Sequence, residues 1–291
     1  MIHNVQIYII KTGGSILRLP VANKLINGPL KPIYRKVSHA SIRNPVISNG
    51  LSYYYNPDDR GLAFELFEGN YEKETMEVFK NLVHSGMTVV DLGANIGYYA
   101  INAAQIVGNN GRVYAFEPNT PTYQILVRNV MANKYDAIIT PIPKAAWSEK
   151  ATLSFWIDEK DSGSSSVFGA LNRQKTDRVE AVSMDDFFKE QGWPNVDVIK
   201  MDIEGAEKAA LRGMREVIHR NEGIKLIMEF NARIQKEIGL KNDELTDELI
   251  GIGFRKISII KNGLYPINIP EDVPLLMKIA GNEFVNLLCE K

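Results

Sequence analysis

Residues 88–97 constrain the fold of this chain more than any other stretch. The run Thr-Val-Val-Asp-Leu is largely β-branched and apolar around Asp91, and Gly93 and Gly97 then bracket a short turn. Apolar residues recur at helical spacing over residues 96–107. The stretch therefore predicts a strand, a tight turn and a helix, which is the repeating unit of an α/β fold.

The two glycines indicate that other groups approach this turn closely. A side chain at Gly93 or Gly97 would block the approach of the backbone to a ligand and of the helix to the strand. A second strand over residues 112–116 then brings Glu117 to a strand's carboxyl end, where a carboxylate accepts hydrogen bonds from both hydroxyls of a ribose. Together these features predict a binding site for a nucleoside.

Two kinds of nucleoside site compete at this point. A dinucleotide fold carries G-x-G-x-x-G, with a helix N-terminus facing the pyrophosphate and an acid about 20 residues further on. This chain has G-x-x-x-G instead, preceded by Asp91. A carboxylate is unfavourable beside a pyrophosphate but suits the cationic amino-acid end of S-adenosylmethionine, so the methyl donor is the better match. The alternative is that Asp91 only caps the helix and the glycines only shape the turn.

Residues 196–207 form the second informative stretch, a central-strand pattern that ends in a cluster of acids. Period-two geometry puts Lys200 and Asp202 on one face, and a lysine in a buried run needs a counter-charge from Asp202 or from Glu229 on the next strand. Lys200 is therefore either an ion-pair partner or a base with a lowered pKa. Asp202, Glu204 and Glu229 would bind substrate hydroxyls, accept a proton or hold a divalent cation, and carboxylates alone favour Mg²⁺ over Zn²⁺.

Charge and composition exclude several classes of partner. The 291 residues include 34 Lys and Arg against 35 Asp and Glu, a net charge of −1, and the basic residues are dispersed. No polybasic stripe suggests a nucleic acid or an anionic membrane as a partner, and no apolar run approaches membrane-spanning length. The single cysteine, Cys289, excludes an internal disulfide. We expect a protein of the reducing cytoplasm that acts on a small molecule.

Strand-like and helix-like patterns alternate through the central part of the chain. The expected strands lie at 88–92, 112–117, 138–142, 196–202 and 225–230, and the expected helices at 72–84, 96–107, 119–133 and 205–219. Such alternation predicts a mainly parallel, doubly wound sheet. The β-like runs at 254–260 and 284–288 would close it with antiparallel strands.

Two segments depart from this alternation. β-like runs at 152–157 and 178–183 are joined by a polar loop whose core, residues 162–166, is rich in serine and glycine. That loop would be either a lid beside the cofactor or a plain surface loop. Residues 1–70 contain short β-like pieces broken by prolines, without a long helical period. We expect a β-rich N-terminal cap over residues 1–70 and a cofactor-binding domain over residues 71–291.

Three blocks, residues 90–99, 115–118 and 199–207, resemble the FkbM-type S-adenosylmethionine-dependent methyltransferases in content and order, within a likeness over about residues 70–260. The resemblance implies a Rossmann-like class I methyltransferase domain that transfers a methyl group to a hydroxyl oxygen, on a sugar, a polyketide or another small metabolite. It also implies site residues: Asp91, Gly93, Asn95 and Gly97 at the methionine end with Tyr71 upstream, Glu117 and Pro118 at the ribose, Ala145, Ala146 and Trp147 at the adenine, and Asp202 and Glu204 at the acceptor. Tyr98, which opens the helix after the turn, would contact the carboxylate of the cofactor.

The residues themselves narrow the acceptor. Methylation of an exocyclic amine of a base uses a Pro-Pro-aromatic tetrapeptide after this strand, and methylation of a ring carbon uses a cysteine nucleophile; neither is present. An alcohol must lose a proton as it attacks the sulfonium methyl, and Asp202, Glu204 and Lys200 are the candidates for that step. A nicotinamide-dependent oxidoreductase and a catalytically silent nucleoside-binding module are the alternatives. The sequence leaves the acceptor, the base and the oligomeric state open.

Overall fold

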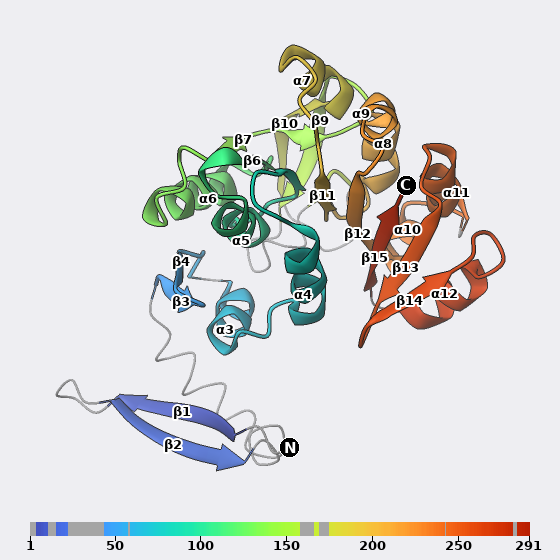
Figure 1. Cartoon of the computed structure of the whole chain (residues 1–291). Helices are drawn as coiled ribbons and strands as arrows, with labels where there is room; N and C mark the ends of the chain where they lie inside the picture. The colour runs from blue at the N-terminus through green and yellow to red at the C-terminus, as the bar shows by residue number, and fades with distance from the viewer. Residues whose placement is uncertain are drawn as a thin grey trace.

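A computed structural model of the chain describes residues 4–10, 16–22, 44–57, 59–157, 166–168, 175–241, 243–281 and 284–291. Within these residues the largest element is an eight-stranded sheet with the strand order β14-β13-β15-β12-β11-β5-β6-β7 (Figure 1). Its strands are β5 (Thr88–Leu92), β6 (Arg112–Phe116), β7 (Ile139–Ile142), β11 (Val198–Met201), β12 (Lys225–Asn231), β13 (Lys256–Ile260), β14 (Leu264–Ile267) and β15 (Phe284–Glu290).

The direction of the strands follows from how the chain connects them. The five strands from β7 to β12 pair in parallel because a helix or a longer crossover separates each from the next. β15, the last strand, inserts antiparallel between β12 and β13, and β14 folds back on β13 as a hairpin. The predicted mainly parallel sheet with antiparallel closing strands is confirmed.

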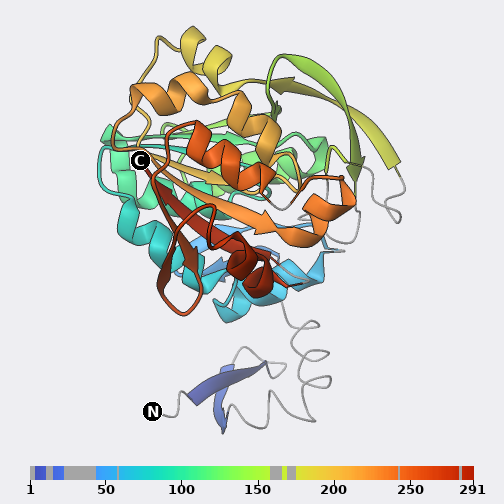
Figure 2. The same ribbon diagram turned by 90° about the vertical axis from the view of Figure 1, so that its right-hand side faces the viewer.

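Helices cover both faces of this sheet, as Figures 1 and 2 show. One buried cluster joins Val89 and Val198 to helices α4 (Lys73–Leu82), α5 (Tyr98–Val107) and α6 (Thr120–Ala132). Their sequence neighbours Val90 and Ile199 face the opposite cluster, which contains helices α7 (Met184–Glu190), α8 (Glu207–Arg212), α9 (Arg215–Arg220), α11 (Glu244–Gly251) and α12 (Val273–Ala280). Burying each such side chain contributes roughly 1.5–3 kcal/mol to the stability of the fold. The strands are apolar on both faces because helices bury both faces.

The predicted helix over residues 205–219 is wrong in one respect, because it is two helices. α8 ends at Gly213 and α9 starts directly afterwards. A Cβ atom at Gly213 would lie 2.1 Å from the carbonyl oxygen of Trp147, so the chain must bend where it passes the neighbouring backbone. The short helices α7, α10 (Ala232–Glu237), α11 and α12 were not expected either.

The described part of residues 1–70 contains two β hairpins and one helix. β1 (Asn4–Ile10) pairs with β2 (Ile16–Ala22), and β3 (Val46–Ser48) pairs with β4 (Leu51–Tyr53). Helix α3 (Arg60–Glu68) ends at the left-handed Gly69 and corrects the expectation of no helical period in this region. Val46, Leu51 and Tyr53 share the buried cluster of α5. The division of the chain at residue 70 stays a prediction.

Two asparagines, Asn129 in α6 and Asn133 at its C-cap, hold the segment around β4. Asn129 accepts a hydrogen bond from the backbone N–H of Tyr54 and donates to its carbonyl oxygen, at 2.6 and 2.9 Å. Asn133 does the same for Ser52, at 2.9 and 2.8 Å. Asn129 also donates to the carbonyl oxygen of Ile96, at 2.8 Å. One buried side chain therefore connects the N-terminal segment to the glycine turn.

The inserted strands form a small sheet of their own in the described part of the chain. The two predicted β-like runs correspond to strands β9 (Ala151–Ile157) and β10 (Lys175–Val182), which pair antiparallel, and β8 (Ala145–Ala146) pairs in parallel with β10. Of the predicted lid core, residues 162–165 lie outside the described residues. Among the described residues, no helix has the length and apolar character needed to cross a bilayer.

Candidate active site

The direction in which successive strands are added to the sheet reverses at β5, and this reversal creates a crevice. β6 and β7 follow on one side of β5, whereas β11 and β12 lie on the other, so the loops after β5 and β11 diverge between them. Ligands of such sheets bind at this point, outside the carboxyl ends of the strands. A pocket lies there, and it brings together most of the predicted site residues: Tyr71, Asp91, Gly93, Asn95, Tyr98, Glu117, Pro118, Ala145, Ala146, Lys200, Asp202 and Glu204.

Gly93 allows the two halves of this crevice to meet. Its backbone is left-handed, with φ of 80°, and an added Cβ would lie 1.8 Å from the carbonyl oxygen of Asp202. No side chain fits there. Gly97, with φ of 91°, does not line the pocket; an added Cβ would lie 2.6 Å from the side chain of Leu126, so this glycine allows α5 to pack against α6.

Asp91 performs the capping role that the sequence left open and also lines the pocket. Its Oδ2 accepts a hydrogen bond of 2.9 Å from the backbone N–H of Ala100 in the first turn of α5. Burial raises the pKa of Asp91 to about 7, although the ammonium of Lys200 and this hydrogen bond oppose the shift. A cation at this carboxylate would offset the desolvation.

Glu117 is held in place by main-chain donors on both sides. Its Oε2 accepts from the N–H of Asn95 and its Oε1 from the N–H of Asn119, each at 2.9 Å. Burial raises the pKa of Glu117 to about 7 against these two hydrogen bonds. A carboxylate has about four acceptor positions, so capacity for two ribose hydroxyls remains.

Trp147 is the other predicted cofactor residue that lies outside the pocket lining. Its backbone N–H donates to the carbonyl oxygen of Val182 at 3.0 Å, and the centroid of its ring lies 6.2 Å from that of Phe168. It packs instead against the apolar cluster that contains Ala145 and Phe155 of β9.

Lys200 of β11 is fully buried and lines the pocket. Its Nζ lies 3.5 Å from Oδ2 of Asp202 and 5.0 Å from the centre of the Tyr99 ring, and it has no hydrogen-bond partner among the described residues. Burial alone would lower the pKa of Lys200, but the carboxylates of Asp202, Glu72, Glu229 and Asp91 together raise it. Such a lysine is an ammonium at neutral pH, which favours the ion-pair role over that of a base.

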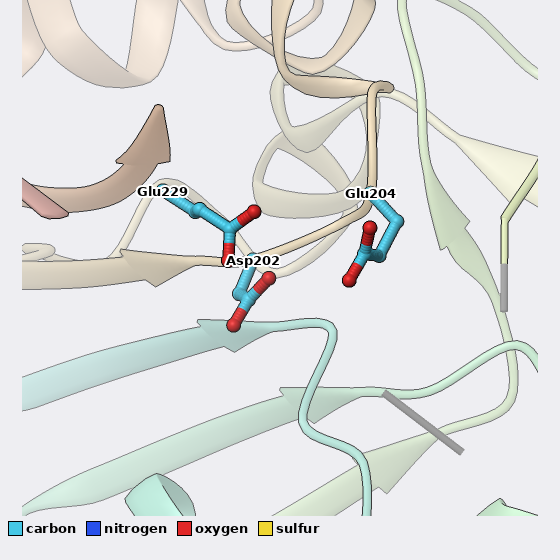
Figure 3. Close-up of side chains that lie close together, drawn as sticks. All are labelled: Asp202, Glu204 and Glu229. Atoms are coloured by element: carbon cyan, nitrogen blue, oxygen red, sulfur yellow. The ribbon is translucent and has the colours of Figure 1, made fainter. Parts of the chain in front are cut away.

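Three carboxyl groups converge beside this lysine at the carboxyl ends of β11 and β12 (Figure 3). Asp202, Glu204 and Glu229 each offer an oxygen within 4.8 Å of the others. Glu229 lies behind the pocket wall, where burial and the carboxylates of Asp202, Glu204 and Glu207 raise its pKa to about 10. Its surroundings therefore favour the neutral form of Glu229.

Glu72 and Tyr99 also line the pocket, and neither was predicted as a site residue. The Tyr99 hydroxyl donates a 2.7 Å hydrogen bond to Glu72, whose pKa is raised by burial despite the attraction of Lys200. Glu72 has φ of 41° and no capping bond at the start of α4, so its backbone is strained without a local reason. A glutamate at a helix start has an ordinary explanation in sequence, and only the fold brings it to Lys200.

The loop between β9 and β10 reaches the same end of the pocket. Ser166 is buried and its hydroxyl donates to the carbonyl oxygen of Glu204 at 2.5 Å, where φ is 51°. Val167 lines the pocket. The described end of the predicted lid segment therefore contacts the acid-bearing turn after β11.

Comparison with known proteins agrees with this architecture. Residues 91–256 match the model of the methyltransferase FkbM domain. The chain is 26% identical over 180 residues to the hexuronic acid methyltransferase AglP of Haloferax volcanii, covering 61% of this chain and 72% of that protein.

Solved structures with some similarity are also methyltransferases. Fibrillarin of Aeropyrum pernix with bound S-adenosyl-L-methionine is 16% identical, with a TM-score of 0.44 over 97% of this chain and 92% of that one. A precorrin-6y C5,15-methyltransferase of Geobacter metallireducens is 10% identical, with a TM-score of 0.43 over 76% and 88%. The family match spans the glycine turn, Glu117 and the acid-bearing turn after β11. The chain belongs to the FkbM methyltransferase family, and it is an S-adenosylmethionine-dependent methyltransferase.

Proposed function

We propose that this protein transfers a methyl group from S-adenosylmethionine to a hydroxyl oxygen of a small molecule, with sugars as the first class to test. The observation that carries the proposal is the position of Asp202, which lines the pocket one residue beyond β11, next to the turn that contains Gly93. A similar protein, AglP, is named as a hexuronic acid methyltransferase.

The proposed pose of the cofactor follows the chemistry of the pocket wall. The ammonium end of the cofactor would meet Asp91, with its methionine portion along Gly93 and Asn95, between Tyr71 and Tyr98. The ribose would bind Glu117 beside Pro118, and the adenine would lie against Ala145 and Ala146, with Trp147 packed against the apolar cluster that contains Ala145. Gly97 would act indirectly, through the packing of α5. All of these except Gly97 and Trp147 line the pocket.

In the proposed reaction, the acceptor oxygen attacks the methyl carbon in line with the carbon–sulfur bond. The new carbon–oxygen bond forms as the carbon–sulfur bond breaks, and its electrons neutralise the sulfonium to give S-adenosylhomocysteine. The hydroxyl proton passes to Asp202, with Glu204 as the second candidate acceptor. Lys200 would remain an ammonium and hold Asp202 by charge, at 3.5 Å.

The predicted magnesium site involves the same acids. Three carboxylates are the ligands that Mg²⁺ prefers. However, the ammonium of Lys200 already lies 3.5 Å from Asp202 and supplies a counter-charge there. We therefore route no step through a metal. We expect excess chelator to leave methyl transfer unchanged; loss of activity in chelator, restored by Mg²⁺, would establish Asp202, Glu204 and Glu229 as ligands.

The function is tested by incubating the protein with S-adenosylmethionine and a library of sugars, phenols and polyketide alcohols. We expect S-adenosylhomocysteine and a methyl ether to form together, as measured by mass spectrometry. Thermal stabilisation by S-adenosylmethionine without methylation of any hydroxyl would favour the catalytically silent module, and methylation of nitrogen or carbon instead would contradict the proposal. The absence of a nucleic-acid partner and the cytoplasmic location stay predictions.

A further inference from the structure

A stripe of polar side chains crosses the otherwise apolar sheet at the acceptor end of the pocket. Lys200 pairs with Asp91 in the register of β11 and β5, and with Ile227 in the register of β11 and β12. Glu229 lies two residues beyond Ile227, and it pairs with Asn286 of β15. Paired residues, and residues two apart in a strand, share a face of the sheet. The stripe therefore runs across four strands below the pocket.

Lys200 is the member of this stripe that lacks a hydrogen bond. Its side chain is 1% exposed and lines the pocket, and its Nζ has no hydrogen-bond partner in the described part of the chain. Leaving a buried ammonium without an acceptor is costly, and native structures avoid it unless a ligand or water completes the site. A bound molecule that offers an oxygen acceptor would satisfy it.

The neighbours of Lys200 restrict what that molecule can be. An ammonium has donors only, whereas the carboxylates of Asp202 and Glu204 have acceptors only. A carboxylate on the ligand would satisfy Lys200 but would lie against these acids, and a metal ion or amine would satisfy the acids but meet the ammonium. A hydroxyl group both accepts and donates, and two adjacent hydroxyls would satisfy both kinds of neighbour.

We propose that Lys200 and Asp202 together select an acceptor with a vicinal diol on an uncharged sugar. One hydroxyl oxygen accepts a hydrogen bond from Nζ of Lys200, and the adjacent hydroxyl, which is methylated, donates to Asp202. A uronic acid is disfavoured, because its carboxylate adds a like charge beside Asp202 and Glu204. The inference rests on the proposed function, and it differs from what the name of the relative AglP would suggest.

The test compares matched pairs of methyl glycosides, neutral and uronic, in the gluco, galacto and manno series. Binding to the protein loaded with S-adenosylhomocysteine is measured by saturation-transfer NMR, and methyl transfer by mass spectrometry. We expect the neutral member of at least one pair to bind about tenfold more tightly or better, because adding a like charge at contact distance costs at least this much. Equal or tighter binding of the uronic acids would overturn the inference.

Variants test whether Lys200 and Glu204 cause the preference for neutral over uronic glycosides. Lys200→Met should weaken the neutral glycoside about tenfold, which is the loss expected for a hydrogen bond to a charged donor. Because that variant risks misfolding, Glu204→Gln provides a second measurement: it should narrow the difference between neutral and uronic glycosides. Glu216→Gln on α9, where Glu216 pairs with Arg220 at the surface, is the matched control and should not change it. An unchanged preference in Glu204→Gln would also overturn the inference.

The two proposals can fail separately. Methylation of phenols or polyketide alcohols, with no sugar bound, would overturn the diol inference and leave O-methylation intact. Selective binding of neutral glycosides without methylation of any hydroxyl would overturn the proposed function and leave intact only the part of the diol inference that concerns binding.

Discussion

The two halves of the pocket are built in different ways. On the proposed cofactor side, Asp91 and Glu117 accept hydrogen bonds from backbone N–H groups that lie between 2 and 22 residues away along the chain. On the proposed acceptor side, side chains hold one another: Tyr99 donates to Glu72, and Lys200 pairs with Asp202. The first half depends mainly on the consecutive elements β5, α5 and β6, whereas the second half is assembled from α4, α5, β11, β12 and β15.

The largest expected effect concerns the point where the two halves touch. Gly93→Ala should abolish measurable binding of S-adenosylhomocysteine and cost about 3 kcal/mol of stability, because the new Cβ would lie 1.8 Å from the carbonyl oxygen of Asp202 at φ of 80°. Calorimetry and urea unfolding measure both. Gly223→Ala is the control, since no described atom lies within 4 Å of its added Cβ. A folded Gly93→Ala protein with normal affinity would contradict the described contact.

Asp202→Asn should impair methyl transfer, the proposed role of the acceptor side of the pocket, without impairing cofactor binding on the other side. Loss of a general base lowers the rate about 100-fold or more, and the affinity for S-adenosylhomocysteine should stay within a factor of about three. The measurement is kcat with the best acceptor, together with the dissociation constant by calorimetry. Asp136→Asn, at an exposed position, serves as the control. If Glu204→Gln lowers kcat more than Asp202→Asn does, the base is Glu204.

The affinity of the cofactor half of the pocket for S-adenosylhomocysteine should depend on pH. Asp91 and Glu117 have pKa values of about 7, raised mainly by burial, so both are largely protonated at pH 6 and ionised at pH 8. A ligand that needs the ionised forms binds more weakly at the lower pH, by up to about tenfold for each carboxyl. S-adenosylhomocysteine should therefore bind more tightly as the pH rises from 6 to 8, with proton release in calorimetry.

Glu117→Gln should reduce the slope of that pH dependence, because an amide does not ionise. An unchanged slope in this variant would mean that Glu117 does not titrate on binding, and a flat profile in the parent protein would contradict the role of both carboxyls.

The smallest expected effect separates two similar asparagines. Asn129→Ala and Asn133→Ala should each cost about 1–3 kcal/mol of stability in urea unfolding, since each leaves backbone groups of the N-terminal segment unpaired. Only Asn129 also binds the carbonyl oxygen of Ile96, so only Asn129→Ala should weaken S-adenosylhomocysteine binding, by a few-fold. Equal effects of both variants on that affinity would show that the link to the turn is unimportant.

The comparison also explains what could be predicted from the sequence. The strand, turn and helix at residues 88–107 were predicted within two residues, because β-branched runs, glycines and helical spacing all act locally. Antiparallel strands at 254–260 and 284–288 were also predicted, from two short apolar runs, but the position of β15 between β12 and β13 was not. Most of the predicted cofactor residues consequently line the pocket.

The remaining features depend on contacts distant in sequence. Glu72 reaches the pocket only because α4 packs on the sheet beside β15, where Asn286 lies 3.5 Å from its carboxylate. α7 was missed although Ser183 caps it and Asp185 and Asp186 follow, because Ser183 was assigned to the preceding strand. Gly97 and Trp147 carry family motifs but act through packing, which a motif does not distinguish from contact with a ligand.

The hydrogen bonds of Asn129 and Asn133 also fix how the N-terminal segment around β4 is aligned with α6. Four residues along a helix advance about 6.0 Å, and two residues along an extended chain advance about 6.6 Å. The distance between Asn129 and Asn133 along the helix therefore matches the distance between Tyr54 and Ser52 along the extended chain, and each asparagine can pair with one of these residues. Inserting or deleting one residue between Ser52 and Tyr54 would turn one of the two backbone pairs away from its asparagine. In this protein a helix does the aligning that a neighbouring strand performs within a sheet.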